Sequence, residues 1–137
     1  LGDDLVSSGR GDDVLSGGWG ADRLLGWVGS DTLRGDGGDD VLNGQFGSDV
    51  LEGGAGADRF VFQGATFGTD FVVDFTPGTD TLALTGAGSA ATLAQFRANS
   101  EQVGNLVVHD MGGDGQGVLI LSGVTLGQLS AGDFDFA

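Results

Sequence analysis

Seven aspartates recur every nine residues through the first part of the sequence. They are Asp4, Asp13, Asp22, Asp31, Asp40, Asp49 and Asp58. A solvated acidic face has no reason to keep an exact period, whereas a repeated ligand position does. Carboxylate oxygens are the ligands that hard divalent cations prefer. The series therefore indicates repeated binding of a metal ion.

Glycines and apolar residues follow the same interval, which gives the unit Gly-Gly-x-Gly-x-Asp-x-U-x with U apolar. The first six positions predict a tight turn, because glycine permits the positive φ that aims carbonyl groups inward. The last three positions predict a short strand, with U pointing inward and its neighbours outward. The U series is Val6, Leu15, Leu24, Leu33, Leu42, Leu51 and Phe60.

Two units form one coil of 18 residues, with a strand on each face and a turn at each edge. Coils stack about 4.8 Å apart, which is the spacing between strands of a sheet. The sequence therefore predicts an all-β fold, a right-handed parallel β-roll. Aspartates 18 positions apart then form two columns, one of Asp4, Asp22, Asp40 and Asp58, the other of Asp13, Asp31 and Asp49.

Stacked carboxylates roughly 5 Å apart repel one another unless a cation lies between them. Calcium fits, because it takes six to eight oxygen ligands in flexible geometry, and turn carbonyls can complete its shell. Magnesium demands a rigid octahedron, and zinc is disfavoured because the sequence has no Cys and a single His. The columns contain three gaps and two gaps, which predicts about five calcium ions.

The charge balance agrees with bound cations. Acidic residues number 20 against 5 basic ones, for a net charge of −15. Such a chain repels nucleic acid and anionic membranes and needs neutralisation to become compact. Its 29 glycines add a large ordering entropy, so without the cation we expect disorder. No apolar run approaches the ~18 residues of a membrane span.

The repeat resembles the RTX (repeats-in-toxin) calcium-binding family over residues 2–61. The resemblance implies that two successive stacked turns bind each ion together. The first turn contributes its Asp and the main-chain carbonyls at unit positions 2 and 4, and the ion lies between it and the next stacked turn. That turn adds carbonyls at positions 1 and 3 and its own Asp. One implied site consists of Gly18, Gly20 and Asp22 with Gly35, Gly37 and Asp40. The other implied glycine ligands are Gly9, Gly11, Gly26, Gly29, Gly38, Gly44, Gly47 and Gly53.

Some units depart from this pattern. Trp27, Asp36 and Gln45 stand at position 2 in place of glycine. Only the carbonyl group is needed there, so we expect weakened turns rather than lost sites. Ser8 replaces the first glycine of its unit, which makes the N-terminal sites the least regular.

The period breaks after Val61, and we divide the chain into a roll (1–61) and a C-terminal capping region (62–137). The segments Gly68–Val72 and Gly78–Leu82 are interpreted as degenerate turns that end the roll, with Asp70 and Asp80 as further candidate ligands. Beyond them the cap is predicted to be β-rich with one short helix. The elements expected are a helix at Leu93–Ala98 after the capping residue Thr92, a hairpin of Leu106–Val108 and Val118–Leu121, and covering residues Leu126, Leu129, Phe134 and Phe136.

The second half is similar to the C-terminal regions of RTX proteins exported by type I secretion, among them serralysin-type proteases and alginate epimerases. The similarity lies in Arg59–Phe62, in Asp74-Phe75 and in the acidic, then apolar terminus 133–137. It implies a bacterial protein at the cell surface or secreted, with the type I secretion apparatus as a partner. We interpret the chain as the C-terminal piece of a longer protein.

Three functions remain open at this point. The first is a calcium-binding module that drives folding and secretion of a larger protein. The second is a polysaccharide-binding module, in which Trp19 and Trp27 would stack on sugar rings. The third is a structural segment of an adhesin or surface layer. Asp3, Asp12 and Asp39 are interpreted as exposed charge and His109 as an ordinary strand residue. No constellation of residues supports catalysis, so we expect any catalytic domain to lie upstream.

Overall fold

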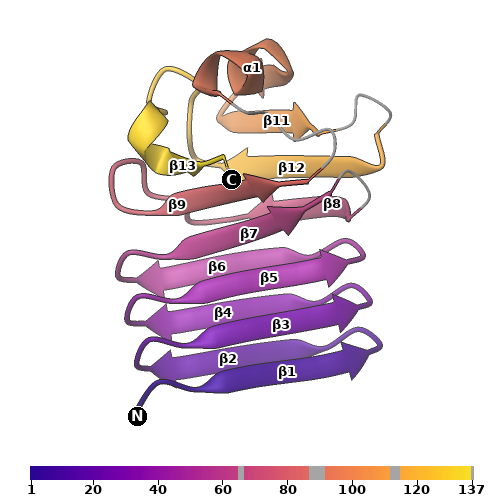
Figure 1. The fold of residues 1–137 in the computed structure, drawn as a ribbon, viewed down its shortest axis with the longest axis vertical. Helices are drawn as coiled ribbons and strands as arrows, with labels where there is room; N and C mark the ends of the chain where they lie inside the picture. The colour runs from indigo at the N-terminus through magenta and orange to yellow at the C-terminus, as the bar shows by residue number, and fades with distance from the viewer. Residues whose placement is uncertain (65–66, 87–91, 112–114, 137) are drawn as a thin grey trace.

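The chain winds into a right-handed roll whose two walls are β-sheets. A computed structural model describes residues 1–137 except 65–66, 87–91, 112–114 and 137. In Figure 1 the odd-numbered strands near the N-terminus run across the front and the even-numbered ones return behind them, one coil above another. The first sheet contains, in spatial order, β1 (Leu5–Arg10), β3 (Arg23–Val28), β5 (Val41–Phe46), β7 (Arg59–Gln63), β9 (Thr81–Thr85) and β13 (Phe134–Asp135). The second contains β2 (Val14–Trp19), β4 (Thr32–Gly37), β6 (Val50–Ala55), β8 (Gly68–Val72), β12 (Gly117–Ser122), β11 (Leu106–Asp110) and β10 (Ser100–Val103).

The register of the strands confirms the coil of 18 residues. Leu24 of β3 pairs in parallel with Leu42 of β5, and Leu33 of β4 pairs with Leu51 of β6. The predicted parallel β-roll is therefore the observed fold. The inward U series forms the core between the sheets, and from Leu15 to Phe60 its side chains are 0–4% exposed.

The strands are longer than the three residues predicted. Each regular strand has six residues and runs from unit position 7 through position 3 of the following unit, as in Val14–Trp19. The pairing skips one residue at position 1 and resumes at position 2, so that Ser16 pairs with Arg34 and Gly18 with Asp36. The strand bends at this point without ending, because the left-handed residue at position 2 still takes part in the ladder. Only the three residues up to each Asp form the turn.

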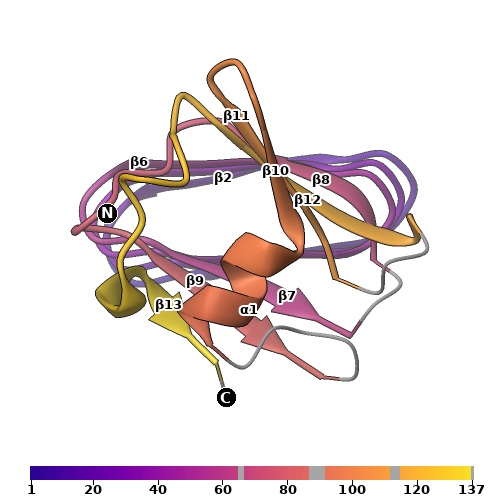
Figure 2. The ribbon, with the colours of Figure 1, turned by 90° about the horizontal axis from the view of Figure 1, so that it is seen from above.

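The cap agrees with the elements predicted for it. Helix α1 (Leu93–Ala98) begins after Thr92, whose side chain accepts a hydrogen bond from the Gln95 backbone at 3.2 Å. Strands β11 and β12 form the expected antiparallel hairpin, although residues 112–114 of its connection lie outside the described part. Phe96 of α1 is fully buried and packs on Phe134 (ring centroids 4.7 Å apart). Seen from above, the helix and the C-terminal strand lie across one end of the roll (Figure 2).

The two sheets do not stop at residue 61. Strands β8, β9 and β12 extend the same sheets beyond the regular repeats. However, neighbouring strands pair over fewer residues at one level of the roll. Strand β5 pairs with β7 only at Val41–Arg59 and Leu42–Phe60, and β6 pairs with β8 only at Val50–Phe71 and Leu51–Val72. Regular neighbours share five pairs. We call this level the seam; in Figure 1, β7 inclines away from β5 there. The division of the chain at residue 61 stays a prediction.

No helix among the described residues is long and apolar enough to cross a membrane.

Candidate metal centre

Direct hydrogen bonds build the aspartate columns. The Oδ1 atom of each column aspartate accepts the backbone N–H of the aspartate one coil earlier, at 2.7–3.0 Å. The same bond continues past the repeats, from the Asp49 N–H to Asp70 (2.9 Å) and from the Asp58 N–H to Asp80 (3.0 Å). The columns are therefore each one member longer than the nine-residue period predicts. They read Asp4–Asp22–Asp40–Asp58–Asp80 and Asp13–Asp31–Asp49–Asp70.

The second oxygen of the central aspartates has no hydrogen-bond partner among the described residues. The Oδ2 atoms that are buried and unbonded belong to Asp22, Asp31, Asp40, Asp49 and Asp58. Burying an ionised oxygen without a partner costs several kcal/mol, so such atoms are expected to bind a cation or a proton. Five of them, repeated along two columns, fit metal ions between the coils.

The glycine at unit position 1 makes room for this oxygen. A Cβ atom on Gly35 would lie 2.3 Å from Asp40 Oδ2 and 2.5 Å from the carbonyl oxygen of Gly53 in the next coil. A Cβ on Gly26 would likewise meet Asp31 Oδ2 at 2.5 Å and the Gly44 carbonyl oxygen at 2.8 Å. The carboxylate oxygen and a carbonyl oxygen of the next coil thus converge on one small space, which a larger residue would fill.

A second glycine, at position 4, allows the coils to stack. Gly38 has φ of +129°, which L side chains rarely adopt. A Cβ placed on it would lie 1.9 Å from the Gly20 carbonyl oxygen one coil earlier. Both the backbone conformation and the close approach therefore require glycine.

Side chains alone do not complete a metal site. Within the described residues, no group of three or more His, Cys, Asp or Glu side chains is placed to hold an ion. The remaining ligands must be main-chain carbonyls, which gives an all-oxygen set. Such a set suits calcium and not zinc.

Burial makes the charged state of the columns unfavourable without a cation. It raises the pKa of Asp49 to about 6 and that of Asp58 to about 6, against an ordinary value of 3.8. The pKa values of Asp31 and Asp40 are raised for the same reason. Backbone hydrogen bonds oppose these shifts, and neighbouring carboxylates reinforce them. A divalent cation would remove both the desolvation cost and the repulsion.

The departures at position 2 keep the turn geometry. Trp27, Asp36 and Gln45 have φ of +76°, +73° and +74°, in the same left-handed region as Gly18 at +98°. For a non-glycine residue this conformation costs about 1–2 kcal/mol. At the irregular N-terminal unit, the Ser8 hydroxyl donates to the Gly26 carbonyl at 2.7 Å, so that carbonyl already has one partner.

The aspartates at unit position 5 do more than the sequence predicted. They are exposed, as expected, but their Oδ1 atoms also accept backbone N–H groups of the next coil at 2.8–2.9 Å. These bonds join Ala21 to Asp3, Ser30 to Asp12 and Ala57 to Asp39. The interpretation as mere exposed charge was therefore incomplete, because sequence spacing cannot show which N–H groups the stacking leaves free.

Three residues outside the repeats have distinct roles. Both oxygens of Asp74 accept backbone N–H groups, from Gly53 and Gly54, where the ladder to β8 has ended. His109 is fully buried in the cap and stacks on Phe96 at 4.1 Å. Its Nδ1 lies 2.9 Å from Ser100 Oγ, and its Nε2 has no hydrogen-bond partner in the described part of the chain. Burial lowers the pKa of His109 to about 4. His109 is thus a core residue of the cap.

The fold and the columns together define a metal-binding β-roll. The family described as the RTX calcium-binding nonapeptide repeat (4 copies) matches residues 1–33 and 28–60. The R3 subunit of AlgE6, a mannuronan C5-epimerase of Azotobacter vinelandii, is 31% identical, with a TM-score of 0.68 over 95% of this chain and 81% of that subunit. The R2 subunit is 28% identical, with the same TM-score over 96% of this chain and 92% of that subunit.

A larger protein contains the same architecture. The extracellular lipase LipA from Serratia marcescens is 29% identical, with a TM-score of 0.81 over 97% of this chain. The chain spans only 21% of that lipase. No curated protein matches the sequence significantly. The chain belongs to the RTX calcium-binding repeat family, and it is a calcium-binding module.

Proposed function

We propose that calcium binding between the coils folds this module, and that the folding switch serves type I secretion of a larger extracellular protein. The observation that carries the proposal is the set of five buried, unpartnered carboxylate oxygens. The proposed ions occupy five gaps, namely Asp4–Asp22, Asp22–Asp40, Asp40–Asp58, Asp13–Asp31 and Asp31–Asp49. The repeat glycines of each pair of stacked turns supply the carbonyl ligands.

The switch follows from the balance between hydrophobic stabilisation, ordering entropy and calcium binding in the roll. One buried apolar residue per nine offers little hydrophobic stabilisation against the ordering entropy of a glycine-rich chain. Calcium binds only the folded columns and so stabilises folding by mass action. At the affinities of extracellular calcium modules, about 10⁻⁴–10⁻³ M, the sites are empty at cytosolic calcium levels and fill outside the cell. The chain is therefore unfolded before export and folded after it.

The contacts that residues 133–135 make with the roll support this order of events. Asp135 forms an ion pair with Arg59, and Phe134 pairs with Leu82 of β9. The Asp133 carboxylate accepts the Gly78 N–H at 2.5 Å. Asp133 and Phe134 are buried in the folded module, so a secretion signal that includes them is fully accessible to the export apparatus only before the cap folds.

A calcium titration monitored by far-UV circular dichroism tests the switch. The chain in excess chelator should lack most of the β signal, and calcium should restore it cooperatively. Magnesium at the same concentration is the control and should not restore it. A complete β signal in chelator would contradict the proposal.

A second candidate function is polysaccharide binding, because the Trp19 side chain is 71% exposed and Trp27 is 46% exposed. Similarity to subunits of a mannuronan C5-epimerase supports it. The net charge of −15 opposes binding of an acidic polymer. Binding to neutral and acidic glycans, compared between the native chain and Trp19→Ala, distinguishes the two functions.

A further inference from the structure

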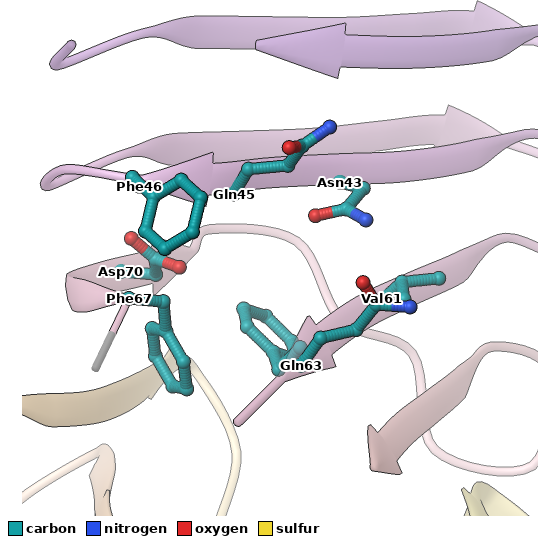
Figure 3. Close-up of a pocket in the computed structure, with 8 residues that line it drawn as sticks. Asn43, Gln45, Phe46, Val61, Gln63, Phe67 and Asp70 are labelled. Carbon is teal, nitrogen blue, oxygen red and sulfur yellow. The ribbon is translucent and has the colours of Figure 1, made fainter. Parts of the chain in front are cut away.

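A small cavity opens in the wall of the roll at the seam. Strands β5 and β7 separate after the pair Leu42–Phe60. A cavity of about 50 Å³ lies there, lined by residues of both strands and of the segment that follows β7 (Figure 3). One water molecule needs about 10–15 Å³, so the space fits a ligand of about three to five non-hydrogen atoms.

The Asp70 carboxylate borders this cavity. Asp70 is 1% exposed, and one of its oxygens accepts the Asp49 N–H at 2.9 Å. No described residue donates to its other oxygen, and this oxygen is not among the carboxylate oxygens that are sealed between the coils. Neither ion pair among the described residues involves Asp70. The side chain therefore offers a buried, unpaired acceptor to whatever occupies the cavity.

Aromatic rings form much of the remaining wall. Phe62 and Phe67 are 2% and 3% exposed and pack together with their ring centroids 5.4 Å apart. Phe46 also lines the cavity and is 56% exposed, so it connects the space to the surface. Figure 3 shows the Asp70 carboxylate between the rings of Phe46 and Phe67. A carboxylate beside aromatic faces attracts an organic cation, because both the charge and the ring quadrupoles favour it.

The lining discriminates between classes of ligand. An anion would meet the Asp70 carboxylate in a chain of net charge −15. A hydrocarbon would leave Asp70 unsatisfied, and also Asn43, which is 7% exposed and has no hydrogen-bond partner among the described residues. A calcium ion needs six to eight oxygen ligands, which aromatic walls do not supply. A primary ammonium brings three N–H donors and an apolar stem that phenyl rings can cover.

We propose that the seam cavity binds the ammonium group of a primary alkylamine, either a free small amine or the tip of a lysine side chain of another protein. The Asp70 carboxylate pairs with the ammonium, and the rings of Phe46 and Phe67 cover the alkyl stem. The site is separate from the five gaps proposed for calcium. The family match ends at residue 60, before Asp70. The module thus has a second ligand besides calcium.

NMR titration of the calcium-loaded full chain with propylammonium tests the site. 1-Propanol has the same number of non-hydrogen atoms and no charge, so propylammonium should bind at least about tenfold more tightly. Asp70→Asn keeps the acceptor for the Asp49 N–H and should weaken propylammonium binding about tenfold. Asp39→Asn removes the same charge from an exposed position and should leave the affinity unchanged. Circular dichroism in calcium verifies that each variant is folded.

Phe46→Ala is a second variant, which decides the matter if Asp70→Asn does not fold, because Phe46 is largely exposed. It should weaken propylammonium binding about threefold. A Gly-Lys-Gly peptide with blocked ends separates the two sources: tighter binding than propylammonium supports a lysine side chain, and weaker binding supports a free amine.

Three results would overturn the inference. The first is equal binding of propylammonium and 1-propanol, and the second is unchanged propylammonium affinity in both Asp70→Asn and Phe46→Ala. The third is displacement of propylammonium by a tenfold increase in calcium at constant ionic strength, which would assign the free Asp70 oxygen to the metal column. All three leave the calcium-driven folding untouched, because circular dichroism tests that separately.

Discussion

Asp40 and Asp39 provide a matched test of the columns, because the residues are adjacent and carry the same charge. Asp40 is buried at the centre of its column and borders the gaps to Asp22 and to Asp58. Asp39 is exposed and only accepts the Ala57 N–H. Asp40→Asn should therefore remove two ions, while Asp39→Asn, which keeps its acceptor oxygen, should remove none.

The expected magnitude follows from mass action. At a free calcium concentration of 10–100 times the dissociation constant, each site stabilises the fold by about 1.4–2.7 kcal/mol. The loss of two sites thus lowers the free energy of unfolding by about 3–5 kcal/mol in saturating calcium. Isothermal titration calorimetry counts the ions, and urea unfolding in calcium measures the stability. Equal effects of the two substitutions on calcium affinity would refute the assignment of the ligand position.

Three further predictions follow from the geometry and the charges. In excess chelator, lowering the pH from about 8 to below 6 should increase the β signal in circular dichroism. Burial raises the pKa of Asp70 to about 8 and those of Asp49 and Asp58 to about 6, so the folded state binds protons that the unfolded chain does not. This stabilisation is complete below the unfolded pKa of 3.8 and is lost as the pH rises through about 6 and about 8; a β signal that is unchanged or falls over this range would contradict it. Asp36→Gly should lower the calcium concentration at the midpoint of folding, because it relieves a φ of +73° and removes a charge that raises the pKa of Asp40. A higher midpoint would show that the hydrogen bond that the Ser16 hydroxyl donates to Asp36 outweighs both effects. Gly38→Ala should abolish folding at calcium concentrations that fold Gly78→Ala, because only at Gly38 does the added Cβ meet backbone, 1.9 Å from the Gly20 carbonyl oxygen. Equal calcium midpoints for the two alanine variants would show that coil stacking tolerates the side chain.

The regular roll could be predicted from the sequence because its pattern is local and periodic. A nine-residue repeat determines which residues face inward, and two repeats per coil determine the register, as the pairing of Leu24 with Leu42 shows. The short helix was equally predictable, since its capping residue Thr92 lies next to it in the chain. The buried aspartates follow from the same period, because stacking places every eighteenth residue in one column.

The tertiary structure decided what happens where the period fails. The insertions before Asp70 and Asp80 look alike in the sequence, yet both residues rejoin the columns with different surroundings. Thr76 satisfies one carboxylate, while the seam leaves the other beside a cavity. Asp74 closes the edge of β6 through two backbone N–H groups that no spacing rule identifies. The Thr76–Asp80 bond spans four positions. The other contacts join residues about 20 positions apart without a repeating pattern, so they depend on how the chain packs beyond the repeats and not on the local sequence.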